Sequence, residues 1–252
     1  MRRFLTLADL SPETMREVLD LAVKIKRAWK AGESTPYLKN KVLGMIFQKP
    51  SLRTRVSFDV AMLQLGGNGL YLSPNEIQLG QRESTADVAR VISRYVNVVM
   101  ARVFSHHDVV ELAKYASVPV INGLSEFSHP CQGMADFLTI LEHKGSFEGR
   151  KLTYLGDGNN VAVSLMDIAV KMGANFSIAN PVGYEMPEQA ISAAKKVALT
   201  SRSKISFYTD PSEAVHDADV IYTDTWVSMG QEAQSEERIR TFKPYQVNQK
   251  LI

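Results

Sequence analysis

Short apolar runs alternate with amphipathic segments along most of the chain. The first segment begins with Ser11 and Pro12, which suit an N-cap and the first helical position, and its apolar residues recur at helical spacing. The pattern predicts a helix over 11–31. It then predicts strands at 42–47, 69–72, 98–102 and 118–121, separated by helical patterns at 53–65, 84–96 and 107–116. Such alternation is typical of a parallel sheet with helices on both faces.

A longer helical pattern within 129–150 interrupts this rhythm and ends near Lys144. The alternation then restarts, with predicted strands at 151–156, 176–180, 205–209 and 219–223, and a last helix within 243–252. The fold prediction is therefore α/β, with two similar domains, each a parallel sheet flanked by helices. The domains are placed at 1–130 and 148–252, joined by a connecting helix over 131–147.

Composition narrows the class of protein. Hydrophobic residues make up 45% of the 252 positions and charged residues 22%, as in ordinary soluble proteins, and the formal charge of +2 argues weakly against nucleic-acid binding. No stretch approaches the roughly 20 apolar residues that span a bilayer. The single cysteine, Cys131, cannot form an internal disulfide and fits a reducing compartment. We expect a cytoplasmic protein with no membrane or nucleic-acid partner.

The first candidate site follows the predicted strand 42–47, in the sequence Ser-Leu-Arg-Thr-Arg at 51–55. Pro50 turns the chain, a helix is expected to begin near Arg53, and Ser51 is placed to cap it. The first amides of a helix are unpaired donors, and the helix dipole adds partial positive charge there. Ser51, Arg53, Thr54 and these amides could together cradle a phosphate dianion. The alternative is a plain N-cap with two solvated arginines.

The segment 51–55 resembles the phosphate signature of the aspartate and ornithine carbamoyltransferase family, whose usual form is Ser-Thr-Arg-Thr-Arg. Leu52 is a departure that keeps the backbone amide, and it leaves open an amine acceptor other than ornithine, such as a modified ornithine or a diamine. Arg102 ends the strand 98–102, and His129-Pro130-Cys131-Gln132 precedes the connecting helix. The resemblance implies that Arg102 and His129 hold the carbonyl oxygen of carbamoyl phosphate.

The same resemblance implies that Gln132 accepts a hydrogen bond from the amide nitrogen of carbamoyl phosphate. The predicted phosphate and carbamoyl contacts are Ser51, Leu52, Arg53, Thr54, Gln78, Arg102, His129 and Gln132, and the predicted catalytic group is Arg53, Arg102, His129 and Gln132. Preorganised cationic donors would stabilise the negative charge that develops on the carbonyl oxygen. In the family that this chain resembles, the loop corresponding to 73–84 reaches into a neighbouring subunit's site, so the resemblance implies that Gln78 contacts the phosphate there and that the protein is a homotrimer.

The second candidate site combines two loops of the later half. Gly-Asp-Gly-Asn-Asn-Val (156–161) lacks the third glycine of a dinucleotide loop, which disfavours an NAD-dependent dehydrogenase. Asp-Thr-Trp-Val-Ser-Met-Gly-Gln-Glu (224–232) follows a strand end, where open α/β sheets bind ligands. This pattern is similar to the ornithine-binding loop of the family. The predicted ornithine contacts are Asn160, Asp224, Ser228 and Met229. Trp226 and Met229 could also be packing residues.

The resemblance implies transfer of the carbamoyl group from carbamoyl phosphate to the side-chain amine of ornithine, giving citrulline and phosphate with no metal or organic cofactor. Family members continue into a further strand with a His-Cys-Leu-Pro loop, so the resemblance also implies that this chain lacks that segment. A non-catalytic carbamoyl-phosphate-binding subunit is the alternative of another class. His106 and His107 have no partner at metal spacing and are expected in a solvated loop.

Overall fold

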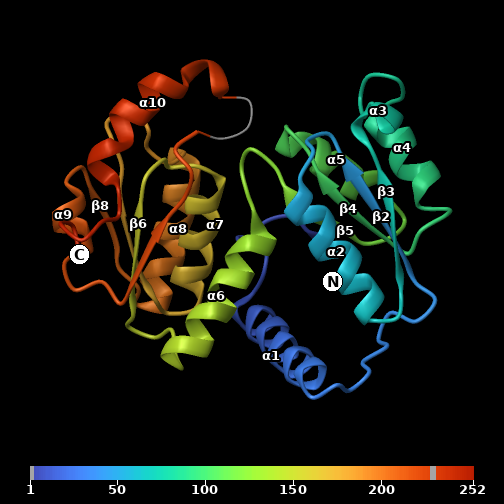
Figure 1. Cartoon of the computed structure of the whole chain (residues 1–252), viewed down its shortest axis with the longest axis horizontal. Coiled ribbons are helices and arrows are strands. Elements are labelled where there is room, and N and C mark those ends of the chain that lie inside the picture. Colours follow the sequence, from blue (N-terminus) through green and yellow to red (C-terminus); the bar gives the residue numbers. More distant parts are fainter. Residues whose placement is uncertain (1–2, 228–230) are drawn as a thin grey trace. The chain divides into compact units, whose positions relative to one another are not determined.

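The structure is a computed structural model that describes residues 3–227 and 231–252 (Figure 1). Its contacts divide the chain into two compact units, Met1–Met134 and Ala135–Ile252. Each unit is built on its own parallel sheet. The boundary falls inside helix α6 (Pro130–Lys144), close to the helix that was expected to connect the two domains.

The first unit contains a five-stranded parallel sheet in the order β1-β5-β4-β2-β3. Its strands are β1 (Arg3–Phe4), β2 (Val42–Phe47), β3 (Asn68–Leu72), β4 (Val98–Arg102) and β5 (Val120–Leu124). Its helices are α1 (Pro12–Lys30), α2 (Leu52–Gln64), α3 (Pro74–Ile77), α4 (Thr85–Ile92) and α5 (His106–Tyr115). The central strands β2 and β4 pair in register, so that Phe47 lies opposite Arg102. The carboxyl ends of these two strands therefore meet at one edge of the sheet.

Alternating side chains of β2 fill two separate cores, because successive strand residues point to opposite faces. Met45 and Phe47 pack with Met62 of α2 on one face. Ile46 packs with residues of α4 and α5 on the other, among them Val88 and Leu112. Since α2 begins directly after β2 and rests on this sheet, its N-terminus is held beside the end of β4.

The second unit contains a four-stranded parallel sheet in the order β8-β7-β6-β9. Its strands are β6 (Lys151–Leu155), β7 (Asn175–Ala179), β8 (Ile205–Tyr208) and β9 (Val220–Thr223). Its helices are α7 (Asn160–Lys171), α8 (Glu188–Ser201), α9 (Pro211–Val215) and α10 (Ser235–Phe242), with 3-10 helices η1 (Glu232–Gln234) and η2 (Lys243–Tyr245). Every residue of α7 from Val161 to Val170 is buried. A helix that is apolar around most of its circumference belongs in a protein core.

Most predicted bounds agree with the structure to within one residue, but three predictions differ by more. β5 is displaced to Val120–Leu124 from the predicted 118–121, because Pro119 has no N–H for the ladder. α4 ends at Ile92 rather than 96, where the Ser93 hydroxyl donates to the Ala89 carbonyl. The helix predicted within 243–252 was wrong. Only η2 forms there among the described residues, and the Asn248 side chain then accepts from two following amides, closing a turn.

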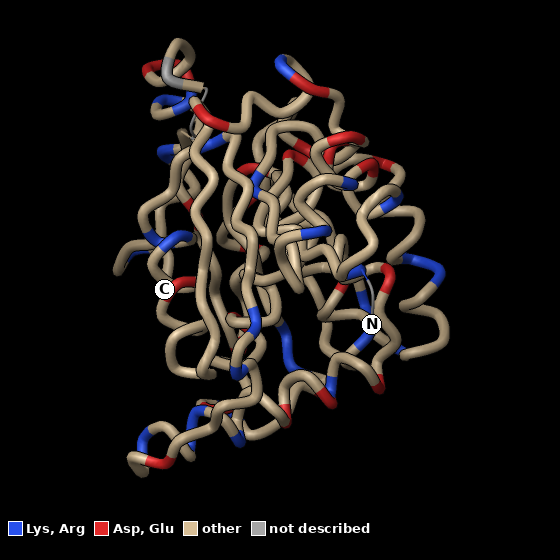
Figure 2. Tube along the Cα trace, turned by 90° about the vertical axis from the view of Figure 1, so that its right-hand side faces the viewer, with Lys and Arg blue, Asp and Glu red and all other residues tan. Residues whose placement is uncertain are grey.

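Within the described residues, no helix is both long and apolar enough to cross a bilayer, and no group of three or more potential ligands could hold a metal ion. Lysine and arginine positions are interspersed with aspartate and glutamate positions along the chain (Figure 2). Any concentration of positive charge must therefore be created locally by the fold.

Candidate functional site

The first candidate site lies where α2 begins, at the carboxyl end of β2. Ser51 is the N-cap of α2, with an extended backbone, and its hydroxyl accepts from the Thr54 amide at 3.4 Å. The same hydroxyl donates to Thr54 Oγ1 at 3.1 Å. The helix begins at Leu52, one residue before the predicted Arg53. The predicted phosphate motif thus occupies the N-cap and first turn of a helix, where unpaired amides favour an anion.

Arg102 joins this group from the neighbouring strand β4. Its Nη1 donates to Thr54 Oγ1 at 3.3 Å, and only 7% of the residue is exposed. Its Nε is buried and has no hydrogen-bond partner within the described part of the chain. Burial lowers the pKa of Arg102, and the positive charge of Arg53 lowers it further. The guanidinium groups of Arg53 and Arg102 repel each other, and Arg102 Nε is a buried donor without an acceptor in the described residues. A bound anion would stabilise this arrangement.

His129 lies half-buried immediately before α6, and Gln132 is half-buried in the first turn of that helix. Burial lowers the pKa of His129 to about 4, and the charge of Arg102 contributes in the same direction. The imidazole is therefore neutral near pH 7, which corrects the expectation of a cationic donor at this position. A neutral imidazole can still donate one hydrogen bond to an oxygen.

The second candidate site lies where adjacent strands β6 and β9 end, with Leu155 paired to Thr223. Asn159 is the N-cap of α7, and its Oδ1 accepts from the amides of Val161 and Ala162. Asn159 Nδ2 is 3.5 Å from Asp224 Oδ2, across the two loops. The predicted ligand residue Asn160 is the first residue of α7.

Asp224 directly follows β9, and its Oδ1 accepts from the Thr225 amide at 2.7 Å. The loop therefore places one of the predicted ornithine ligands near the beginning of α7. Trp226 is half-buried, and its carbonyl accepts a hydrogen bond from Arg238. The other two predicted ligands, Ser228 and Met229, lie outside the described residues.

Comparisons with known proteins show the family to which this chain belongs. Residues 2–142 match the model of the aspartate/ornithine carbamoyltransferase carbamoyl-P binding domain, and residues 148–252 match that of the Asp/Orn binding domain. The chain belongs to the aspartate/ornithine carbamoyltransferase family. The resemblance inferred from the sequence is thereby confirmed.

Among curated relatives of this carbamoyltransferase-family chain, an ornithine carbamoyltransferase of Pyrococcus abyssi is 54% identical over 100% of the chain and 79% of its own length. A solved ornithine carbamoyltransferase from Pyrococcus furiosus superimposes with a TM-score of 0.96 at 54% identity, covering 99% of this chain and 80% of that one. The anabolic enzyme from Campylobacter jejuni gives 0.93 at 40% identity, covering 100% of this chain and 82% of its own. The predicted fold class is confirmed, and the chain spans about four fifths of these relatives.

Two amide side chains, half-buried Gln48 and buried Asn122, support the first candidate site and escaped the sequence analysis. Gln48 follows β2, and its side chain bonds the Phe104 amide and Asp108, while its own amide donates to the Arg102 carbonyl. Asn122 is fully buried in β5, and its Nδ2 donates to the Ser128 carbonyl at 3.2 Å. Asn122 thus braces the segment that precedes His129. For Asn122, the signal available in the sequence was a polar residue inside an apolar strand.

Gln78 lies at the C-cap of α3 with a positive φ of 39°, and it is exposed. Its side chain donates to the Asn75 carbonyl at 3.4 Å, a contact within its own loop. No described hydrogen bond joins it to Ser51, Arg53 or Arg102 of the same chain. Its predicted role toward a neighbouring subunit stays a prediction.

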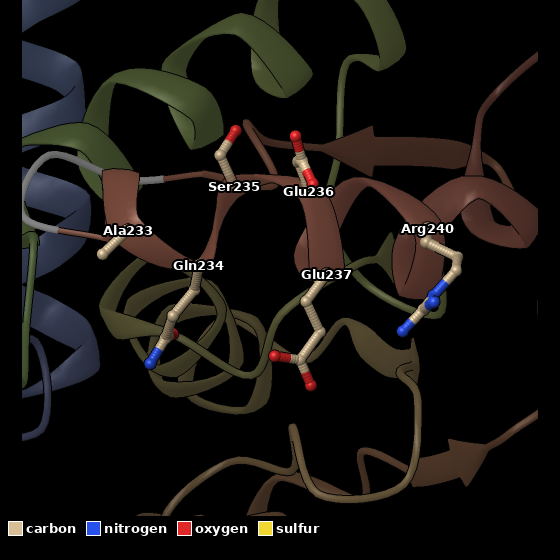
Figure 3. A pocket seen from close by; sticks show the side chains of 6 residues that line it. All are labelled: Ala233, Gln234, Ser235, Glu236, Glu237 and Arg240. Carbon is tan, nitrogen blue, oxygen red and sulfur yellow. The ribbon is translucent and has the colours of Figure 1, made fainter.

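A separate hollow of about 670 Å³ lies along η1 and the first turns of α10. Figure 3 shows its lining, which consists of Ala233, Gln234, Ser235, Glu236, Glu237 and Arg240. One continuous segment supplies all six residues, and two of them are carboxylates. The hollow contains none of the residues predicted to bind substrate, so we do not assign it to the reaction.

Proposed function

We propose that the chain transfers the carbamoyl group of carbamoyl phosphate to the side-chain amine of L-ornithine, producing L-citrulline and phosphate. The observation that carries this proposal is the meeting of Arg102, Thr54 and the beginning of α2, with the charge of Arg53 close enough to affect Arg102. Relatives that cover the whole chain at about half identity bear the name of this activity.

The phosphate of carbamoyl phosphate binds at the first amides of α2. Its two negative charges offset the repulsion between Arg53 and Arg102, and the hydroxyls of Ser51 and Thr54 supply further donors. Leu52 contributes its backbone amide, since its side chain is 79% exposed. Carbamoyl phosphate therefore binds first and fixes the position of the carbonyl carbon.

The carbonyl oxygen accepts hydrogen bonds from Arg102 and from neutral His129, and the carbamoyl NH2 donates to Gln132. The lone pair of ornithine's neutral δ-amine forms the new N–C bond, the C–O bond to phosphate breaks, and the amine proton passes to the departing phosphate, which leaves as hydrogen phosphate. Negative charge grows on the carbonyl oxygen during this attack, so donors fixed beforehand lower the barrier. Phosphate leaves as a stable anion, and positioning supplies most of the catalysis.

The amino-acid end of ornithine binds in the second unit. Asn160 contacts the α-carboxylate, and Asp224 accepts from the α-ammonium group, with Ser228 and the Met229 amide as further contacts. The sequence 224–232 contains no lysine or arginine. Aspartate would bring a second carboxylate that needs cationic partners, so this loop favours ornithine. Leu52, which departs from the family's usual threonine, keeps a modified ornithine or a diamine as the second candidate acceptor.

We further propose that the protein works as a homotrimer in the cytoplasm, with Gln78 contacting the phosphate in a neighbouring subunit. An exposed apolar stripe on α2 supports self-association. Its members recur at helical spacing and are Leu52, Val56, Val60 and Leu63, each between 42% and 79% exposed. Such a stripe is unusual on a helix that faces water throughout and is typical of an interface.

The test is colorimetric citrulline production by the purified chain with carbamoyl phosphate and ornithine, beside a panel of other amines and aspartate. Phosphate release is measured in parallel. Citrulline and phosphate in equal amounts, with ornithine preferred, is the expected result. Carbamoyl-phosphate binding without product would instead support a non-catalytic binding subunit, and faster turnover with another amine would reassign the acceptor.

A further inference from the structure

A buried arginine of α10 joins the two loops that carry the predicted ornithine contacts. Only 4% of the Arg238 side chain is exposed, and its Nη2 forms an ion pair with Asp157, whose side chain is 16% exposed. Its Nε donates to the Trp226 carbonyl at 2.5 Å. One guanidinium thus bonds to the β6–α7 loop and to the loop after β9 at the same time.

Two aromatic rings hold the guanidinium in place. Its carbon lies 5.1 Å from the centroid of the Tyr184 ring and 5.2 Å from that of the Phe242 ring. These rings pack edge to face, with centroids 4.8 Å apart. The guanidinium therefore has few alternative orientations, and its two hydrogen bonds keep a fixed geometry.

Both partners of Arg238 lie close in sequence to predicted substrate contacts. Asp157 stands two residues before Asn159, which caps α7 and approaches Asp224. Trp226 follows Asp224 by two residues. Gly158 fixes the same loop from another side, because a Cβ there would collide with the backbone of residues 184–186. Displacement of Arg238 would therefore change the spacing between Asn160 and Asp224.

We propose that Arg238 is a positioning residue that sets the distance between the α-carboxylate and α-ammonium contacts of ornithine. This inference rests on the proposed function. Arg238 does not touch substrate in this account. It acts through Asp157 and the Trp226 carbonyl, and its burial makes the effect insensitive to salt.

Lysine cannot replace this arginine. A lysine keeps the positive charge, but its single ammonium group is a point charge without the planar fork that reaches two acceptors in fixed directions. The substitution Arg238→Lys should therefore preserve the charge balance of the unit while loosening the two loops. The matched control is Arg240→Lys, which makes the same change on the exposed side of α10, beside the hollow in Figure 3.

The experiment measures kcat and both KM values by citrulline production for the parent chain, Arg238→Lys and Arg240→Lys. Misplacement of a substrate by about one ångström can cost about 100-fold in rate, so we expect KM for ornithine to rise about 10- to 100-fold in Arg238→Lys. KM for carbamoyl phosphate should stay within about twofold, because that substrate binds in the other unit and gains nothing from Arg238. Arg240→Lys should match the parent in both constants.

The outcomes distinguish failure of the positioning role of Arg238 from failure of the proposed carbamoyl transfer. An active parent whose Arg238→Lys variant keeps its ornithine KM, or raises both KM values equally, overturns the positioning role and leaves the proposed function intact. A parent that makes no citrulline overturns the proposed function and this inference together.

If Arg238→Lys does not fold, as judged by circular dichroism, Asp157→Asn replaces it. That variant should raise the ornithine KM selectively, and an unchanged KM would overturn the inference.

Discussion

At the residue scale, phosphate binding depends on one arginine that is held in place before any anion arrives and on a second that is exposed. Arg102 is fixed by burial and by its hydrogen bond to Thr54, whereas Arg53 is exposed on the first turn of α2. Arg55, two residues further, instead lies 3.7 Å from Asp59 and stacks on the Tyr71 ring. Arg55 is thus engaged within the first unit, whereas the charge of Arg53 acts on Arg102, so the two arginines of the motif should have different roles.

The substitution Arg53→Ala should weaken carbamoyl-phosphate binding while leaving the fold intact. Loss of hydrogen bonds to a charged group costs about 1.5–3 kcal/mol, so the dissociation constant should rise about 10- to 100-fold. Isothermal titration with carbamoyl phosphate measures this change. Arg55→Ala is the control and should bind nearly as tightly as the parent. Equal losses in both variants, or none in Arg53→Ala, would contradict the assigned roles.

His129 should make folding stability depend on pH. Its pKa falls from 6.5 to about 4 on folding, mainly through burial and secondly through Arg102. The unfolded chain thus binds the proton more readily, so stability is full above pH 6.5 and declines as pH falls toward 4. The total effect is up to about 3 kcal/mol.

Urea unfolding at pH 7.5 and pH 5 tests this dependence. The parent chain should lose more stability on acidification than His129→Asn, whose amide does not titrate. Parallel losses in both proteins would mean that His129 has an ordinary pKa in the folded state.

At the scale of elements, the sequence predicted strand bounds that are set by apolar runs and helix starts that are set by capping residues. The bounds of β2 and β4 agree with prediction because Gln48 follows the apolar run of β2 and Arg102 ends that of β4, and Ser51 caps α2 as expected. The role of Arg238 could not be predicted, since it pairs with Asp157 across 81 residues and with Trp226 across 12. A charged residue in an amphipathic helix is ordinarily expected to face water, and only the tertiary fold reverses that expectation.

The β6–α7 loop illustrates the same limit. The missing third glycine disfavoured a dinucleotide loop but gave no reason for Gly158, which the structure shows in close approach to the backbone of residues 184–186. Gly158→Ala should therefore destabilise the protein by about 1–3 kcal/mol, because the neighbouring backbone must move. Gly183→Ala is the control, since it has a positive φ but open space around it, and should cost about 1 kcal/mol. Urea midpoints compare them, and equal costs would exclude the steric explanation.

At the scale of the whole molecule, the proposed trimer places the α2 stripe between subunits. Leu63→Lys, at a residue 65% exposed, should then shift the protein toward monomers in sedimentation velocity, because a charge would be buried at the interface. Leu199→Lys makes the same change at another exposed leucine, 83% exposed, on α8 of the second unit. It should leave the association state unchanged. A parent chain that is already monomeric at micromolar concentration would contradict the proposal.

The central claim is that the beginning of α2, with Arg53 and Arg102, binds the phosphate while the carbonyl oxygen faces Arg102 and His129. A crystal structure with a bisubstrate analogue, carrying a phosphonate at one end and the ornithine skeleton at the other, tests it most directly. The account predicts the phosphonate at the first amides of α2, in contact with both guanidinium groups. A phosphonate bound elsewhere, with Arg53 and Arg102 making no contact with it, would contradict the account.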